Sequence, residues 1–134
     1  MIIGVPKEIC PGEQRVALTP ANVSALLKKQ GVEIIIERGA NDGLRALPPS
    51  MTRDNLSRLI EQAQASGASV LLTGMRAPPN LGRDYVDAFN GIYPDLAKRF
   101  DILFYPFFLE GVAGNTSLNQ ADGIHPTGRG IAII

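Results

Sequence analysis

Short apolar runs alternate with amphipathic stretches along this chain, and that alternation constrains its fold more than any other feature. The apolar runs cover residues 2–5, 32–36, 69–73 and 102–108. Apolar residues at helical spacing fill residues 19–31, 52–67 and 85–100, and a last helix is expected over 126–134. This order predicts an α/β fold: a three-layer, doubly wound parallel sheet of about four strands with helices on both faces.

Two details sharpen this prediction. Pro94 lies inside the third helical stretch and should kink or break it, because proline lacks the N–H that a helix interior needs. Ligands of doubly wound sheets bind at the carboxyl ends of the strands. The loops at Pro6, Asn41, Met75 and Asp122 should therefore share one edge of the sheet.

Composition narrows the classes of function. With 134 residues, 45% of them apolar and 19% charged, the chain is expected to fold as a single globular domain over residues 1–134. The 13 basic and 13 acidic side chains balance, so neither a nucleic acid nor a membrane is expected as a partner. A single cysteine, Cys10, and the absence of a signal-like start favour a cytoplasmic protein. One histidine argues against a zinc site, and no cofactor is expected.

Three polar residues are candidates for chemistry. Asp122 and His125 are three residues apart, so one short turn can present both, and Asn41 follows an apolar run. An imidazole base, a carboxylate that orients it and an amide that stabilises an oxyanion are the charge-handling parts of a serine hydrolase. Purely structural roles stay open: Asn41 and Asp42 in an Asx turn, and Asp122 and His125 as caps of the last helix.

Five stretches of the chain together match a known family, in the family's order: residues 39–49, 75–80, 93–97, 106–110 and 122–126. By these stretches most of the chain resembles the SGNH (GDSL-type) hydrolases, and among them the bacterial multifunctional group of acyl-CoA thioesterase I, arylesterase and lysophospholipase. It implies a flavodoxin-like sheet and a small-molecule ester or thioester as substrate. It also implies Asn41 as oxyanion donor, His125 as general base and Asp122 as its partner.

The first segment resembles a different family. Residues 3–8, 11–20 and 36–40 look like the start of alanine dehydrogenase and of the NAD(P) transhydrogenase alpha subunit. That resemblance implies that Arg15 holds a keto-acid carboxylate, although no Gly-x-Gly-x-x-Gly follows any predicted strand. We therefore interpret the chain as a chimera, natural or engineered, in which residues 1–39 are joined to a truncated hydrolase segment over 40–134.

The nucleophile of the hydrolase family has no counterpart at the end of the first predicted strand, which continues into Pro6, Lys7 and Glu8. None of the serines lies in Gly-Asp-Ser or Gly-x-Ser-x-Gly: Ser24, Ser50, Ser57, Ser66, Ser69 and Ser117. Little or no hydrolysis is thus expected, because a general base needs a hydroxyl to deprotonate. The alternatives are an anion-binding domain that uses Arg15 and a weak esterase.

The chain is also expected to form a homodimer. A sheet of about four strands leaves an open edge, and residues 131–134 are entirely apolar. Both features favour association with a second copy.

Overall fold

The computed structural model describes residues 33–134, and these contain a three-stranded parallel sheet. Its strands are β1 (Glu33–Glu37), β2 (Ser69–Thr73) and β3 (Leu103–Tyr105), hydrogen-bonded in the order β1-β2-β3. Ile35 pairs with Leu71, and Leu71 pairs with Leu103. The predicted strand over 2–5, the predicted helix over 19–31, Cys10 and Arg15 lie outside the described residues. The predicted α/β fold with a parallel sheet is confirmed.

Helices connect the strands and follow them. They are α2 (Ala40–Leu44), α3 (Pro49–Ala65), a 3-10 turn η1 (Pro79–Leu81), α4 (Arg83–Asn90), α5 (Ile92–Phe100) and α6 (Gly128–Ile131). The helix predicted over 52–67 corresponds to α3. The stretch predicted over 85–100 is broken as expected, but at Gly91 between α4 and α5. Pro94 is tolerated as the third residue of α5, where a backbone N–H has no helical partner.

Two predicted elements are shorter than expected. The strand predicted over 102–108 ends at Tyr105, because Pro106 has no N–H to donate to the sheet. The helix predicted over 126–134 begins only at Gly128, where the Thr127 hydroxyl caps it by accepting the Gly130 N–H at 3.3 Å. It ends at Ile131, so the helix predicted over 126–134 is shorter than expected at both ends.

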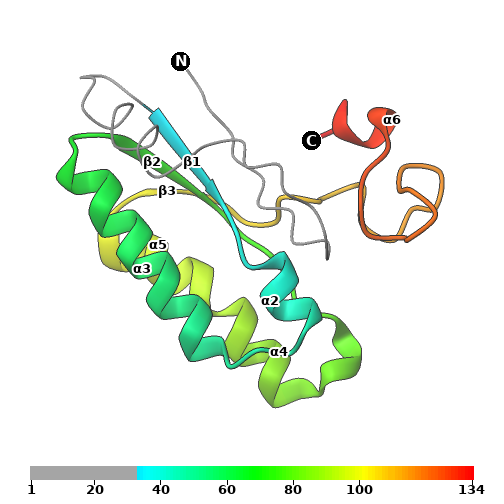
Figure 1. Ribbon diagram of the computed structural model, residues 1–134, viewed down its shortest axis with the longest axis horizontal. Coiled ribbons are helices and arrows are strands. Elements are labelled where there is room, and N and C mark those ends of the chain that lie inside the picture. Colours follow the sequence, from blue (N-terminus) through cyan, green and yellow to red (C-terminus); the bar gives the residue numbers. More distant parts are fainter. Residues whose placement is uncertain (1–32) are drawn as a thin grey trace, which may run out of the picture.

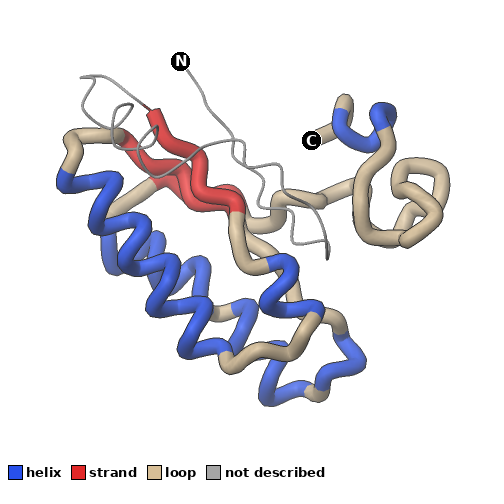
Figure 2. The backbone as a smooth tube through the Cα atoms, viewed as in Figure 1, coloured by secondary structure: helices blue, strands red, loops and turns tan. Residues whose placement is uncertain are grey.

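One face of the sheet packs against α3 and α5, and α4 packs on these two helices, as Figures 1 and 2 show. The core between these layers is built from apolar side chains of both: Ile36, Val70, Leu72, Leu56, Ile60, Phe89, Ile92 and Leu96. On the other face, Leu103 is 71% exposed and Tyr105 is 41% exposed. Among residues 33–134, the long helices therefore cover a single face.

The exposed apolar side chain of β3 generates a prediction about association. We expect the protein to form dimers that Leu103→Lys weakens at least several-fold, because a charged residue on an edge strand opposes pairing with a second copy. Sedimentation equilibrium over a wide concentration range measures this. Met51→Lys, at a residue of α3 that is 51% exposed, is the matched control and should leave the dimer intact. A wild-type mass of 14.4 kDa at every concentration would contradict the prediction.

Candidate active site

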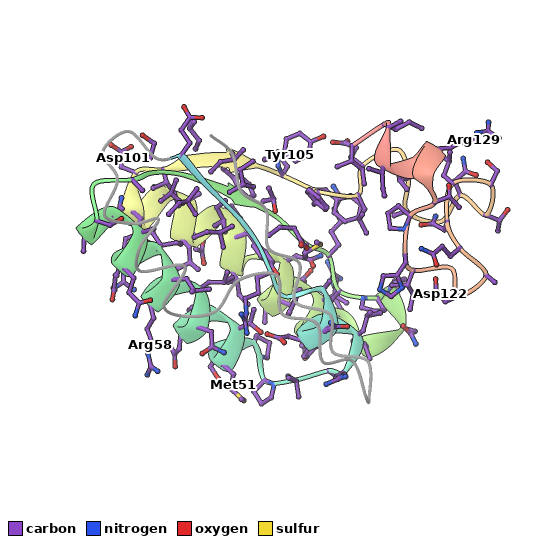
Figure 3. The ribbon with its side chains drawn as sticks, turned by 45° about the horizontal axis from the view of Figure 1, so that its top comes forward. Met51, Arg58, Asp101, Tyr105, Asp122 and Arg129 are labelled. Atoms are coloured by element: carbon purple, nitrogen blue, oxygen red, sulfur yellow. The ribbon has the colours of Figure 1, made fainter. Side chains whose placement is uncertain are left out.

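Asp122 and His125 meet within one tight turn of the C-terminal segment, where Figure 3 labels Asp122. The Nδ1 atom of His125 lies 2.8 Å from Oδ2 of Asp122. The other carboxylate oxygen, Oδ1, accepts the backbone N–H groups of Ile124 at 2.9 Å and of His125 at 3.0 Å. The two side chains therefore lie close together, as predicted. The backbone of the turn by itself orders the carboxylate, and the imidazole adds a further contact.

These contacts keep Asp122 ionised. The backbone N–H groups of His125 and then Ile124, followed by the His125 ring, lower the pKa of Asp122 to about 2. Asp122 is consequently an anion at neutral pH and can accept a hydrogen bond from the Nδ1–H of His125. In the tautomer that donates from Nδ1, Nε2 carries the lone pair that a general base requires. Both side chains are about half exposed.

Asn41 lies at a different place, in the first turn of α2 directly after β1. Within residues 33–134 its side-chain amide makes no hydrogen bond, so both of its N–H donors are available. Its neighbour Asp42 accepts the Thr52 hydroxyl at 3.0 Å rather than closing an Asx turn. The Asx reading of Asn41 and Asp42 is therefore wrong, because the segment is helical and tied to α3.

The start of α2 is positioned by Tyr93, a residue for which the sequence predicted no role of its own. The buried Tyr93 hydroxyl donates to the Arg38 carbonyl oxygen at 3.0 Å. Gly39 has a φ of 109°, and a side chain there would collide with that hydroxyl. Burial, with a further contribution from the charge of Asp42, raises the pKa of Tyr93, which stays a hydrogen-bond donor. No pattern in the sequence predicted this polar contact.

The C-terminal end of the segment over residues 38–47 is held by α4. The Tyr85 hydroxyl donates to the Leu47 carbonyl oxygen at 2.8 Å. Tyr85 also stacks on Phe89, with ring centroids 6.0 Å apart. Helices from the covering layer thus fix both ends of residues 38–47, the segment that carries Asn41.

The structure brings Asp122 and His125 together in the C-terminal segment, whereas Asn41 lies in α2, which follows the carboxyl end of β1. Figure 1 shows the chain leaving the carboxyl end of β3 and entering the C-terminal segment beyond the edge where α2 begins. No hydrogen bond links Asn41 to Asp122 or His125. Arg15, the predicted anion ligand, lies outside the described residues.

Among the described residues, no serine hydroxyl forms a hydrogen bond with the His125 imidazole. Within residues 33–134 the His125 ring has Asp122 as its one hydrogen-bond partner. The Ser66 hydroxyl donates to the Ala63 carbonyl oxygen, and the Ser117 hydroxyl donates to Oδ1 of Asn115. In the same part of the chain, no three His, Cys, Asp or Glu side chains gather to hold a metal, and no helix has the length and apolarity to cross a bilayer.

Comparison with known proteins shows to which family the chain belongs. The sequence matches the GDSL-like Lipase/Acylhydrolase family over residues 9–133. The chain belongs to this family. The match of this GDSL-like chain begins well before residue 39, so it overlaps the segment that also resembles alanine dehydrogenase.

Individual relatives agree with the family. The GDSL-like chain is 44% identical to Esterase TesA of Pseudomonas aeruginosa over 107 residues, which cover 79% of this chain and 53% of that protein. It superposes on a crystal structure of TesA with a TM-score of 0.71 at 42% identity, covering 78% of this chain and 58% of the other. The chain thus spans about half the length of the curated esterases it matches.

The comparisons also find similarity to alanine dehydrogenase. The chain is 56% identical to alanine dehydrogenase of Bacillus subtilis over 43 residues, which are 32% of this chain and 11% of that protein. The match to the GDSL-like family covers most of the chain, and the match to this alanine dehydrogenase covers about a third of it.

The Tyr93 contact predicts a loss of stability on removal of one hydroxyl. Tyr93→Phe should lower the free energy of unfolding by about 1–2 kcal/mol, because the Arg38 carbonyl oxygen loses its donor. Urea denaturation followed by circular dichroism measures the change. Tyr105→Phe, on exposed β3, is the control and should change little. Equal effects of the two variants would contradict this account of α2.

The Asp122 contacts predict a titration. The side-chain carboxyl carbon of Asp122, followed by NMR, should titrate near pH 2, below the ordinary value of 3.8. Because the folded pKa is depressed, the contribution of Asp122 to stability is present above about pH 4 and is lost as the pH falls through 2. In His125→Ala the midpoint should rise yet stay below 3.8, since the two backbone donors remain. A wild-type midpoint near 3.8 would contradict the described turn.

Proposed function

We propose that this chain carries the proton-transfer part of an SGNH-type ester or thioester hydrolase site without a positioned nucleophilic serine, and that it hydrolyses esters little or not at all. The observation that carries the proposal is the contact of 2.8 Å between His125 Nδ1 and Asp122 Oδ2, with Nε2 unpartnered in the described residues. An anionic Asp122 keeps the imidazole in the tautomer that accepts a proton at Nε2. Membership of the GDSL-like family supports this assignment of roles.

Asn41 supplies the second part of the site. Its free amide, at the carboxyl end of β1, can donate to an oxyanion that forms on an ester carbonyl. Rigid placement matters here, because a donor stabilises the transition state only if it is ordered beforehand. The contacts of Tyr93 with Arg38 and of Thr52 with Asp42 provide that order.

The missing part is a nucleophile at this edge of the sheet. Ser69 begins β2 and Ser66 ends α3, so both lie at the opposite, amino edge. Ser50 and Ser57 belong to α3, and the Ser117 hydroxyl is committed to Asn115. Ser24, which lies outside the described residues, is not in a family motif. A base and an oxyanion donor without a nucleophile retain a small fraction of catalysis, because triad members act as a unit.

The incomplete site has a simple origin if the chain is a chimera. In this proposal residues 1–39 derive from an alanine dehydrogenase-like protein and residues 40–134 from a hydrolase. The segment of 43 residues at 56% identity to alanine dehydrogenase supports such an exchange. Replacement of the hydrolase's first strand and loop would remove the serine motif while leaving Asn41, Asp122 and His125 in place.

An ester assay tests the proposed function. Hydrolysis of p-nitrophenyl butyrate by the wild type should stay within about twofold of the buffer rate and should be unchanged in His125→Ala. TesA of Pseudomonas aeruginosa, assayed in parallel, confirms that the substrate and conditions are suitable. A wild-type rate far above buffer that His125→Ala abolishes would overturn the proposal and would establish a complete site.

A further inference from the structure

Asn119 is a buried polar side chain that the proposed chemistry does not use. It is 6% exposed and lies three residues before Asp122. Its side-chain amide donates to the carbonyl oxygen of Val112 at 2.7 Å and to that of Asn115 at 2.8 Å. Its own oxygen, Oδ1, is buried without a hydrogen-bond partner. An unpaired buried acceptor is costly, so the side chain calls for an explanation.

The need of the Val112 and Asn115 carbonyl oxygens for a hydrogen-bond donor does not explain why an asparagine is buried here. The Val112 carbonyl oxygen also accepts the Asn115 N–H at 3.1 Å. The Asn115 carbonyl oxygen also accepts the backbone N–H of Leu118 at 3.0 Å and that of Asn119 at 3.1 Å. Both acceptors would keep a partner if the amide were absent. An apolar side chain, packed beside the buried Val112 and Leu118, would fill the site without an orphaned oxygen.

The position of Asn119 relative to the Asp122–His125 turn suggests what the amide does. Asn119 forms an antiparallel bridge with Pro126, and the Gln120 N–H donates to the His125 carbonyl oxygen at 2.7 Å. The Thr127 N–H donates to the Leu118 carbonyl oxygen at 2.8 Å. Residues 118–120 and 125–127 are thus the two arms that close the turn. The Asn119 side chain connects the first arm to residues 112–115.

We propose that Asn119 is a positioning residue, whose two amide hydrogen bonds fix the arms of the Asp122–His125 turn and so keep the base and its carboxylate assembled. The inference rests on the proposed function, because the assembled pair matters only if His125 acts as a base. Asn119 touches neither Asp122 nor His125 through its side chain, so it acts through the backbone of the turn. The unpaired Oδ1 is the cost of using an amide where a hydrocarbon would fit.

The test compares Asn119→Leu with Val112→Ala. Asn119→Leu removes the donors and fills the space, so the urea midpoint should change little. The Asp122 carboxyl, which titrates at about 2 in the wild type, should then shift measurably toward 3.8 as its backbone donors loosen. The Ile124 and His125 amides should exchange at least tenfold faster with deuterium. Val112→Ala, a cavity in the same loop, should lower the urea midpoint without moving the Asp122 titration. An unchanged titration and unchanged exchange in a folded Asn119→Leu would overturn the proposal.

A measurement on the wild type covers the case in which Asn119→Leu does not fold. In native-state hydrogen exchange at low denaturant, the Asn119 side-chain amide should become exchangeable in the same opening as the Ile124 and His125 N–H groups. Opening of the turn while the Asn119 amide stays protected would overturn the proposal. Neither readout depends on turnover, so an active wild type would refute the proposed lack of hydrolysis without deciding the role of Asn119.

Discussion

The hydrogen bond from Tyr93 to the Arg38 carbonyl oxygen joins the helical layer to the exit of β1, and the placement of α2 depends on it. The ring of Tyr93 meets Phe89 edge-on with centroids 5.9 Å apart. Phe89 in turn lies directly under Gly43, where an added side-chain carbon would come within 3.0 Å of the ring. Gly39 and Gly43 therefore let α2 approach two aromatic side chains closely. A larger residue at either position would push Asn41 away from the sheet edge.

The two parts of the site are ordered by different physics. The Asp122–His125 pair is local, since one carboxylate accepts two N–H groups of its own turn and one imidazole. Asn41 is placed by long-range packing, because its helix is tied to α3, α4 and α5 by side chains distant in sequence. Hydrogen bonds within one turn survive a change elsewhere in the chain more readily than packing between distant elements does. Under the proposed function, this difference would allow the Asp122–His125 pair to persist where the rest of the catalytic site is incomplete.

The sequence predicted those features that depend on short-range patterns. Apolar runs located β1 and β2 to within a residue, and the Asp-x-x-His spacing predicted the meeting of Asp122 and His125. The strand predicted over 102–108 ran past Pro106, which has no N–H to donate, so the end of β3 at Tyr105 was missed. The late start of α6 was missed because it depends on the contact of Thr127 with Gly130. Tyr93 and Arg38 are 55 positions apart, and no periodicity reveals such a pair. Asn119 was missed for the related reason that an asparagine in a loop normally indicates exposure.

A fluorophosphonate probe tests whether this GDSL-like chain lacks an activated serine, as the proposed function requires. Such a reagent forms a covalent adduct with a serine only when a neighbouring base activates its hydroxyl. Intact-protein mass spectrometry after prolonged exposure should find the unmodified mass of 14.4 kDa, while TesA treated alongside should be labelled completely. Stoichiometric labelling of one serine in this protein, lost in His125→Ala, would contradict the account.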